Sequence, residues 1–139
     1  MYKIRYAGDG DKSFWFNVDS SIDEITFENK VQNYMAYIFE EDLKKIGILR
    51  YSLFGDNIPF CNLLCIAESF RHKGCGRALI RYWENDMRSR RYTFTMVSSY
   101  IDGDMYAFYR KMGYREAGGI VIPNKFETDS TRLLMIKQL

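Results

Sequence analysis

The sequence is poor in cysteine, proline and histidine, and it lacks any long hydrophobic run. No uninterrupted apolar stretch approaches the roughly 20 residues that a membrane-spanning helix needs. The first residues form an alternating pattern, whereas a signal peptide would show a basic segment followed by an apolar one. We therefore expect a protein with no membrane partner and a cytoplasmic location.

The three cysteines, Cys61, Cys65 and Cys75, are too few for a disulfide framework, and their number is odd. This usage fits a reducing compartment. A structural zinc site needs four ligands, and the only histidine of the chain is His72. We expect no bound metal, and we interpret Cys61 and Cys65 as buried apolar thiols in a strand.

Linkers, repeats and low-complexity stretches are also absent. A chain of 139 residues fits one domain on the usual scale of ~100 to 200 residues, so we expect a single domain spanning residues 1–139. Hydrophobic residues make up 47% of the chain and aromatic residues 17%. This content is sufficient for a closed core and excludes intrinsic disorder.

Hydrophobic periodicity predicts an α/β protein. Alternating or short β-prone runs predict strands, and apolar residues three or four positions apart predict helices. The expected strands are residues 2–6, 35–40, 46–54, 59–67, 92–98, 114–122 and 132–139, and the expected helices are residues 12–18, about 22–31, 79–87 and 105–112. The order is therefore β-α-α-β-β-β-α-β-α-β-β.

Two strands in the middle of the chain are expected to form a parallel pair. The near-continuous apolar character of residues 59–67 predicts a central strand that is buried on both faces. Residues 92–98 return after one helix, so this strand should run parallel to the first through a right-handed crossover.

Capping residues mark the expected helix ends. Ser20 or Ser21 is expected to cap the second helix, and Asp102 or Asp104 the fourth. Gly113 suits the position just after the fourth helix, where the backbone commonly turns left-handed.

Charge is concentrated in one segment. Residues 71–91 hold seven basic residues and two acidic ones, a net charge of +5 in a chain whose total is +2. The remainder of the chain is therefore acidic, at −3. The segment predicts a polyanionic partner.

This basic segment begins with a glycine-bearing turn, residues 71–76, between the buried strand and an amphipathic helix. Helix N-termini present unpaired N–H groups and a positive dipole end, and Gly74 and Gly76 let the backbone approach a ligand closely. The turn matches neither a phosphate-binding P-loop nor a dinucleotide fingerprint, because Leu79 stands where the third glycine would fall. An anion site and a solvated basic turn both remain open.

Two motifs resemble those of the GNAT superfamily of N-acetyltransferases. Arg71-x-x-Gly74-x-Gly76, between a strand and a helix, resembles the family's [QR]-x-x-G-x-[GA] acyl-CoA loop. Residues 107–114, Ala-Phe-Tyr-Arg-Lys-Met-Gly-Tyr, resemble its A-x-x-F-Y-x-x-x-G-[FY] helix-to-strand motif in the compact form F-Y-x-x-x-G-Y. The two motifs lie in the family's order, and the predicted element order agrees over nearly the whole chain.

The resemblance implies a fold and an activity. The fold would be a single α/β domain whose sheet is mixed and mainly antiparallel, with a central parallel strand pair splayed at the acyl-CoA site and helices on both faces. The activity would be transfer of an acetyl group from acetyl-CoA to a primary amine of a small molecule or peptide, by direct attack in a ternary complex.

The resemblance also implies roles for particular residues. Backbone amides of the loop would hold the coenzyme A pyrophosphate, the end of the preceding strand would hydrogen-bond the pantetheine arm, and Tyr109 would be the general acid. The implied cofactor-binding residues are Leu64, Cys65, Ile66, Arg71, His72, Lys73, Gly74, Cys75, Gly76, Arg77 and Asp104. The alternative for Tyr109 is that it only belongs to the apolar stripe of its helix.

The sequence departs from the family's pattern at two positions. Asp104 stands where many members have an asparagine that contacts pantetheine, and Phe60 stands where some members have a glutamate base. The amine must lose a proton before attack, so a water chain, Glu68 or Asp56 remain as alternatives for the base.

Rival interpretations follow from these departures and from the charge. One is a catalytically inactive acyl-CoA-binding or sensor domain, and another is a nucleic-acid surface at residues 71–91, against which we expect no nucleic-acid partner because no such motif is present. The C-terminal strand, which includes residues 133–136, either pairs across a homodimer or completes the sheet of one chain.

Overall fold

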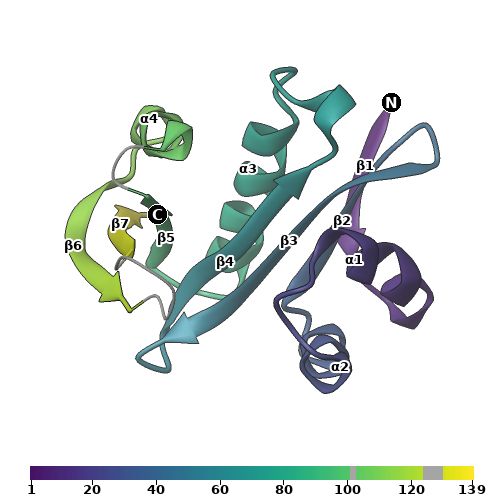
Figure 1. The fold of residues 1–139 in the computed structure, drawn as a ribbon, viewed down its shortest axis with the longest axis horizontal. Helices are drawn as coiled ribbons and strands as arrows, with labels where there is room; N and C mark the ends of the chain where they lie inside the picture. The colour runs from purple at the N-terminus through teal and green to yellow at the C-terminus, as the bar shows by residue number, and fades with distance from the viewer. Residues whose placement is uncertain (101–102, 124–129) are drawn as a thin grey trace. The chain divides into compact units, whose positions relative to one another are not determined.

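The computed structural model describes residues 1–100, 103–123 and 130–139. Its strands and helices follow one another in the predicted order, with a short 3-10 turn before the first helix and another before the third (Figure 1). The elements are β1 (Tyr2–Tyr6), η1 (Asp9–Asp11), α1 (Lys12–Val18), α2 (Glu24–Gln32), β2 (Ala36–Glu41), β3 (Lys44–Phe54), β4 (Ile58–Ile66), η2 (Glu68–Phe70), α3 (Cys75–Ser89), β5 (Phe94–Tyr100), α4 (Asp104–Lys111), β6 (Arg115–Ile122) and β7 (Ser130–Gln138).

The strands form one mixed sheet with the order β1-β2-β3-β4-β5-β7-β6. β4 and β5 pair in parallel, with Phe60 opposite Met96. The pairs β1–β2, β2–β3, β5–β7 and β6–β7 are antiparallel. The prediction of a mixed, mainly antiparallel sheet with a central parallel pair is confirmed.

The chain packs as two compact units. The first unit comprises residues 1–52 and 62–83, and the second comprises residues 53–61 and 84–139. β4 and α3 each contribute residues to both units.

In the first unit, helices cover both faces of β2 and β3. Ile38 and Ile48 pack in one core with Trp15 of α1 and Phe27 of α2, all four fully buried. Neighbouring strand residues point to the opposite face, where the Tyr51 ring lies 5.9 Å from that of Trp83 in α3. Trp15 of α1 is thus part of the core.

Burial on both faces was predicted for the wrong strand. Consecutive residues are buried along β2 and β3. In β4, by contrast, Asn62 is exposed and residues 63–65 are only half-buried. β2 and β3 carry this burial because α1 and α2 pack on one of their faces and α3 on the other.

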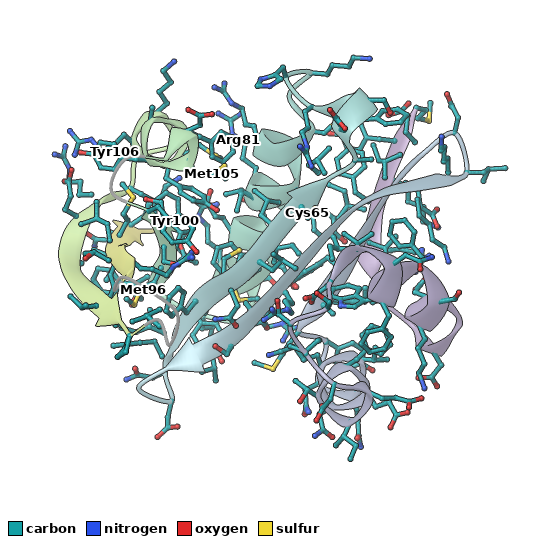
Figure 2. The ribbon with its side chains drawn as sticks, in the orientation of Figure 1. Cys65, Arg81, Met96, Tyr100, Met105 and Tyr106 are labelled. Atoms are coloured by element: carbon teal, nitrogen blue, oxygen red, sulfur yellow. The ribbon has the colours of Figure 1, made fainter. Side chains whose placement is uncertain are left out.

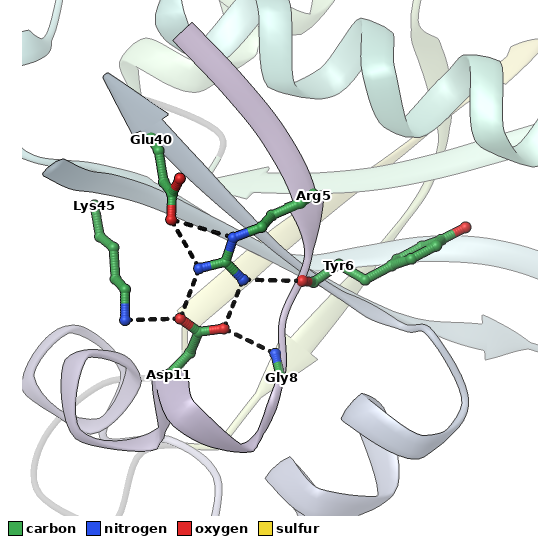
Figure 3. A network of polar contacts seen from close by, with 6 residues as sticks. All are labelled: Arg5, Tyr6, Gly8, Asp11, Glu40 and Lys45. Carbon is green, nitrogen blue, oxygen red and sulfur yellow. Dashed lines mark hydrogen bonds and ion pairs between the residues drawn. The ribbon is translucent and has the colours of Figure 1, made fainter. Parts of the chain in front are cut away.

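A network of charged side chains ties β1 to the start of α1 (Figure 3). Asp11 accepts two hydrogen bonds from Arg5, at 2.8 and 2.9 Å, and lies 2.7 Å from the Lys45 ammonium. Arg5 also bonds Glu40 at 2.8 Å. The Asp11 side chain is almost completely buried, so its charge depends on these partners.

In the second unit, a buried polar cluster joins α3 to β5, to β7 and to Tyr114, the residue before β6. Glu84 of α3 is 2% exposed and accepts hydrogen bonds from Tyr114 at 2.7 Å and from Lys137 at 3.1 Å. The Tyr114 hydroxyl also lies 2.9 Å from Thr95 Oγ1. Burial raises the pKa of Tyr114, and the nearby Glu84 charge raises it further, so the phenol stays protonated.

The helix caps differ from the sequence prediction. Asp23 caps α2 by accepting from the Thr26 amide at 2.8 Å, in place of Ser20 or Ser21. Gly103 is the cap residue of α4, because its backbone is extended and Asp104 is already helical. The other predicted cap, Asp102, lies outside the described residues. Gly113 follows α4 with φ +98°, as predicted.

Candidate functional site

The predicted anion loop lies in the first unit, between the end of β4 and the start of α3. Its backbone is left-handed at His72 (φ +62°) and Gly74 (φ +85°), which reverses the chain into the helix. The Gly74 carbonyl accepts the Ala78 amide at 3.0 Å, the first hydrogen bond of α3. The amides of Cys75, Gly76 and Arg77 therefore belong to the first turn, where a helix has no internal acceptors for them.

This geometry provides backbone donors for an anion. N–H groups at a helix N-terminus, reinforced by the helix dipole, bind phosphate. Glycine at 76 adds no side chain to the first turn, and the left-handed conformation at 74 costs a glycine little. The predicted loop residues 71–77 thus occupy one continuous turn and helix start.

Arg71 ties this loop to the strand before it. Its Nε donates to the carbonyl of Ile66 at 2.8 Å. The resemblance implies cofactor binding by Arg71, and the structure also gives it a positioning role. The Nη groups of Arg71 and the exposed side chains of Lys73 and Arg77 remain on the loop as cations.

The predicted pantetheine-binding residues form the last part of β4. Leu64 and Cys65 are half-buried, and Ile66 is buried. The Ile66 carbonyl is already engaged by Arg71. Backbone groups of Leu64 and Cys65 are therefore the better candidates for contacts to a ligand.

A shallow cavity of about 260 Å³ lies beside the loop, within the first unit. It is partly aromatic, and the loop contributes Lys73, Gly74 and Cys75 to its wall. The remaining lining residues are Tyr2, Phe39, Glu41, Phe70 and Ala78.

Tyr109 lies in the second unit, on α4, and is 4% exposed. Its ring makes edge contacts with Phe108 and Tyr114, with centroids 5.2 and 5.6 Å apart. Burial raises the pKa of Tyr109 well above its usual value, the nearby Cys61 thiol raises it further, and the positive charge of Arg132 opposes both. Tyr109 is therefore a protonated phenol at neutral pH.

The other residues of α4 define what surrounds Tyr109. Met105 and Tyr106 lie on the first turns of the helix, as Figure 2 shows. Tyr109 and Met112 are buried, Phe108 is half-buried and Met105 is exposed, so the predicted apolar stripe is buried only toward the end of the helix. Asp104, predicted as a cofactor contact, is exposed at the first helical position, where its charge favours the helix dipole.

The candidate bases lie on exposed turns. Glu68 is in η2 and Asp56 in the turn before β4, and both are exposed. Phe60 occupies its predicted strand position, with its ring 6.2 Å from that of Phe54.

The acidic residues at the β2–β3 hairpin are engaged in ion pairs. Glu41 and Asp42 pair with the N-terminal ammonium at 2.9 and 3.1 Å. Glu40 pairs with Arg5 at 2.8 Å. All three acids are therefore paired with cations of the chain itself.

Sequence reasoning missed two polar groupings in the second unit. One is the buried cluster at Glu84. Glu84 stands four residues after Ile80 and three before Met87, so helical spacing already places it on the apolar face of α3. The other is Arg132 of β7, which bonds Ser98 and stacks on Tyr100 of β5. No local pattern connects residues that far apart in the chain.

Within residues 1–100, 103–123 and 130–139, no three His, Cys, Asp or Glu side chains gather as metal ligands would. None of the helices in that part of the chain has the length and hydrophobicity to cross a membrane.

The chain matches a known family model. Residues 32–116 match the family model described as Acetyltransferase (GNAT) domain. This stretch holds both sequence motifs and covers more than half of the chain. No curated protein matches in sequence.

Solved structures share the fold over the whole chain. A ribosomal-protein-alanine N-acetyltransferase from Brucella melitensis superposes with a TM-score of 0.84 at 19% identity, covering 99% of both chains. The ribosomal-protein-S18-alanine N-acetyltransferase from Escherichia coli gives 0.83 at 15% identity, covering 99% of this chain and 94% of the other.

A structure with bound acetyl-CoA is also similar. It is a GNAT family acetyltransferase from Elizabethkingia anophelis, with a TM-score of 0.77 at 14% identity and coverage of 99% of this chain and 98% of the other. At such identities these likenesses establish the fold alone.

Proposed function

Because the chain belongs to the GNAT acetyltransferase family, we propose that it is an N-acetyltransferase that moves the acetyl group of acetyl-CoA directly to a primary amine. The acceptor is a small molecule or peptide, and the protein acts in the cytoplasm. The observation that carries the proposal is the loop at residues 71–77, whose left-handed turn leads into the free amides of α3.

The loop would bind the pyrophosphate of coenzyme A. Two phosphates need several N–H donors at close range, and the amides of Cys75, Gly76 and Arg77 supply them at the positive end of a 15-residue helix. Lys73 and Arg77 add positive charge. Leu64 and Cys65 would offer backbone hydrogen bonds to the pantetheine arm.

The transfer needs one nucleophile and one proton donor. The amine nitrogen attacks the thioester carbonyl carbon, and an oxyanion forms on the carbonyl oxygen. When that intermediate collapses, the C–S bond breaks and the thiolate takes a proton. In this proposal the proton comes from the hydroxyl of Tyr109, and water later restores it.

Burial keeps Tyr109 in the protonated form that a proton donor needs. Its raised pKa keeps the hydroxyl protonated at neutral pH, so a donor is present in every turnover. The positive charge of Arg132 opposes the rise. Before attack, the acceptor's ammonium loses a proton to water or an exposed carboxylate. As the amide forms, the nitrogen loses a second proton, which passes through water to Tyr109, and coenzyme A and product then leave.

The rival is an acyl-CoA-binding domain without turnover. Phe60 at the position of the family's glutamate favours it, because no carboxylate in that strand removes the amine proton. Both functions predict the same cofactor binding. Only the reaction distinguishes them.

Substitution of Tyr109 by phenylalanine tests the proposal. We expect Tyr109→Phe to lower kcat by about 10²- to 10⁴-fold, the usual contribution of a general acid, and to leave the acetyl-CoA Kd unchanged. The measurement is thiol release with a panel of primary amines, beside calorimetric titration of acetyl-CoA.

Tyr106→Phe is the matched control. It removes a tyrosine hydroxyl from the same helix, one that donates to Glu116, and we expect kcat to change less than threefold. If the unmodified protein binds acetyl-CoA but acetylates no amine, the binding-domain alternative holds. If both variants retain full activity, Tyr109 is not the proton donor.

A further inference from the structure

Arg132 of β7 is held in place by uncharged groups of β5. Its Nε and Nη2 donate to Ser98 Oγ at 3.3 and 2.9 Å. Its guanidinium stacks on the Tyr100 ring, 4.5 Å from the centroid, and β-sheet pairing places Tyr100 directly opposite Arg132. The Arg132 side chain is half-buried. Figure 2 shows where its ring partner, Tyr100, lies.

These contacts orient the guanidinium without neutralising it. In the part of the chain that the structure describes, Arg132 has no carboxylate partner. A guanidinium has five N–H donors, and Ser98 uses one on Nε and one on Nη2. The end formed by Nη1 and the second Nη2 hydrogen keeps the geometry that binds a carboxylate through two parallel bonds.

The charge of Arg132 reaches the proposed proton donor. Arg132 is close enough to Tyr109 to lower the pKa of its hydroxyl against the effect of burial. Both residues belong to the second unit. α4, which carries Tyr109, follows β5 in the chain, so an anion held by Arg132 would lie in the same unit as the proposed proton donor.

The face of the sheet also fits an external ligand. Thr95 of β5 points toward the buried Glu84 cluster of α3. Side chains alternate along a strand, so Ser98 and Tyr100 lie on the other face, and Tyr100 is 52% exposed. Arg132 shares that face, away from the α3 cluster.

We propose that Arg132 recognises the acceptor, and that the acceptor carries a carboxylate in addition to its amine, as an amino acid or a peptide with a free C-terminus does. This inference rests on the proposed acetyltransferase function and narrows its substrate class. The carboxylate would bind the free fork of the guanidinium, and Ser98 and Tyr100 act as positioning residues.

The test compares acceptors that differ only in this charge. L-alanine, L-glutamate and the dipeptide alanyl-alanine are each assayed beside the corresponding C-terminal amide. For each acceptor, kcat/KM of Arg132→Met is divided by that of the unmodified protein, so that differences in amine basicity cancel.

We expect Arg132→Met to lower kcat/KM about 30-fold or more for acceptors with a free carboxylate, since removing one partner of a hydrogen-bonded charge pair has effects of this size. For acceptors whose only carboxylate is amidated, we expect a change of less than threefold. On acceptors with a free carboxylate, Arg132→Lys should lower kcat/KM by less than Arg132→Met does, because lysine keeps the positive charge but cannot form two parallel hydrogen bonds. Ser98→Ala should lower kcat/KM about threefold, and only for acceptors with a free carboxylate.

Other outcomes overturn the inference in distinguishable ways. An equal loss of kcat/KM on acids and amides would mean that Arg132 acts through Tyr109 or supports folding. The acetyl-CoA Kd and the melting temperature of each variant distinguish these two roles. Acetylation of only those amines that lack a carboxylate would refute carboxylate recognition by Arg132, and the acetyltransferase function would remain. Bound acetyl-CoA with no acceptor in either set would refute the transferase itself.

Discussion

Single side chains in this protein owe their ionisation state to their partners. Burial by itself would raise the pKa of Asp11, but hydrogen bonds from Arg5, Lys45 and the Gly8 amide hold it well below its usual range. The opposite balance applies to Tyr109, where burial dominates and the pKa rises. One buried residue is therefore a permanent anion, and the other is a permanent proton donor.

The state of Asp11 predicts how stability depends on pH. Its folded pKa lies below the unfolded value near 3.8, so its contribution to stability is complete above about pH 4 and disappears as the pH falls through the folded pKa. We expect Asp11→Asn to lower the free energy of unfolding by about 3 kcal/mol at pH 7. The difference from the unmodified protein should shrink steadily below pH 4.

Urea unfolding at several pH values measures this difference. Asp9→Asn serves as the control, because Asp9 is an exposed acid in the same turn, and its effect should stay small. If Asp11→Asn lowered the free energy of unfolding equally at pH 7 and pH 3, Asp11 would not be a buried anion with a lowered pKa.

At the scale of elements, β3 approaches the end of β4 at Gly47. A Cβ added at Gly47 would lie 2.6 Å from Ile66 Cδ1 and 3.2 Å from the Cys65 carbonyl oxygen. Cys65 and Ile66 are proposed cofactor residues. The glycine thus lets a cofactor-binding strand lie close to its neighbour.

We expect Gly47→Ala to destabilise the protein by about 1 to 3 kcal/mol, the usual result of overpacking, and to weaken acetyl-CoA binding by displacing β4. Chemical unfolding and calorimetric titration measure the two effects. Gly10→Ala is the matched control, since a Cβ there meets nothing within 4 Å. Equal stability of the two variants would mean that β4 adjusts without cost.

The start of α2 provides a second test at this scale. Because the Asp23 side chain accepts from the Thr26 amide, Asp23→Ala should measurably lower the melting temperature. Ser20→Ala and Ser21→Ala, at the positions favoured by sequence, should leave it within one degree or so. A larger effect at Ser20 or Ser21 would restore the original prediction.

At the scale of the whole molecule, ligand binding and stability are linked. Acetyl-CoA at 100 times its Kd should stabilise the folded protein by about 2.7 kcal/mol, a rise of roughly 10 °C in melting temperature for a chain of this size. Gly76→Asp should abolish the shift, because it places a carboxylate in the first turn of α3, where the pyrophosphate would bind.

Gly10→Asp adds the same charge in η1 and should keep the shift. Duplex DNA should produce no comparable stabilisation at 150 mM salt, since binding through the basic segment alone is weak and salt-sensitive. Stabilisation by DNA but not by acetyl-CoA would reverse the functional conclusion.

The sequence by itself determined the order of elements and the position of the loop. Periodicity and turn residues are local properties, so α1 was predicted with its observed ends and the parallel partner of β4 was identified. The loop was recognisable because Arg71, Gly74 and Gly76 stand within six residues of one another. The family match over residues 32–116 agrees with both.

Only the tertiary structure decided which charges are buried and which residues meet. Glu84 and Lys137 are 53 positions apart, and Arg132 meets Ser98 and Tyr100 across neighbouring strands. Burial on both faces belongs to β2 and β3 because of the helices that pack on them. Such contacts depend on how strands and helices distant in sequence pack together, whereas sequence patterns report only local conformational preferences.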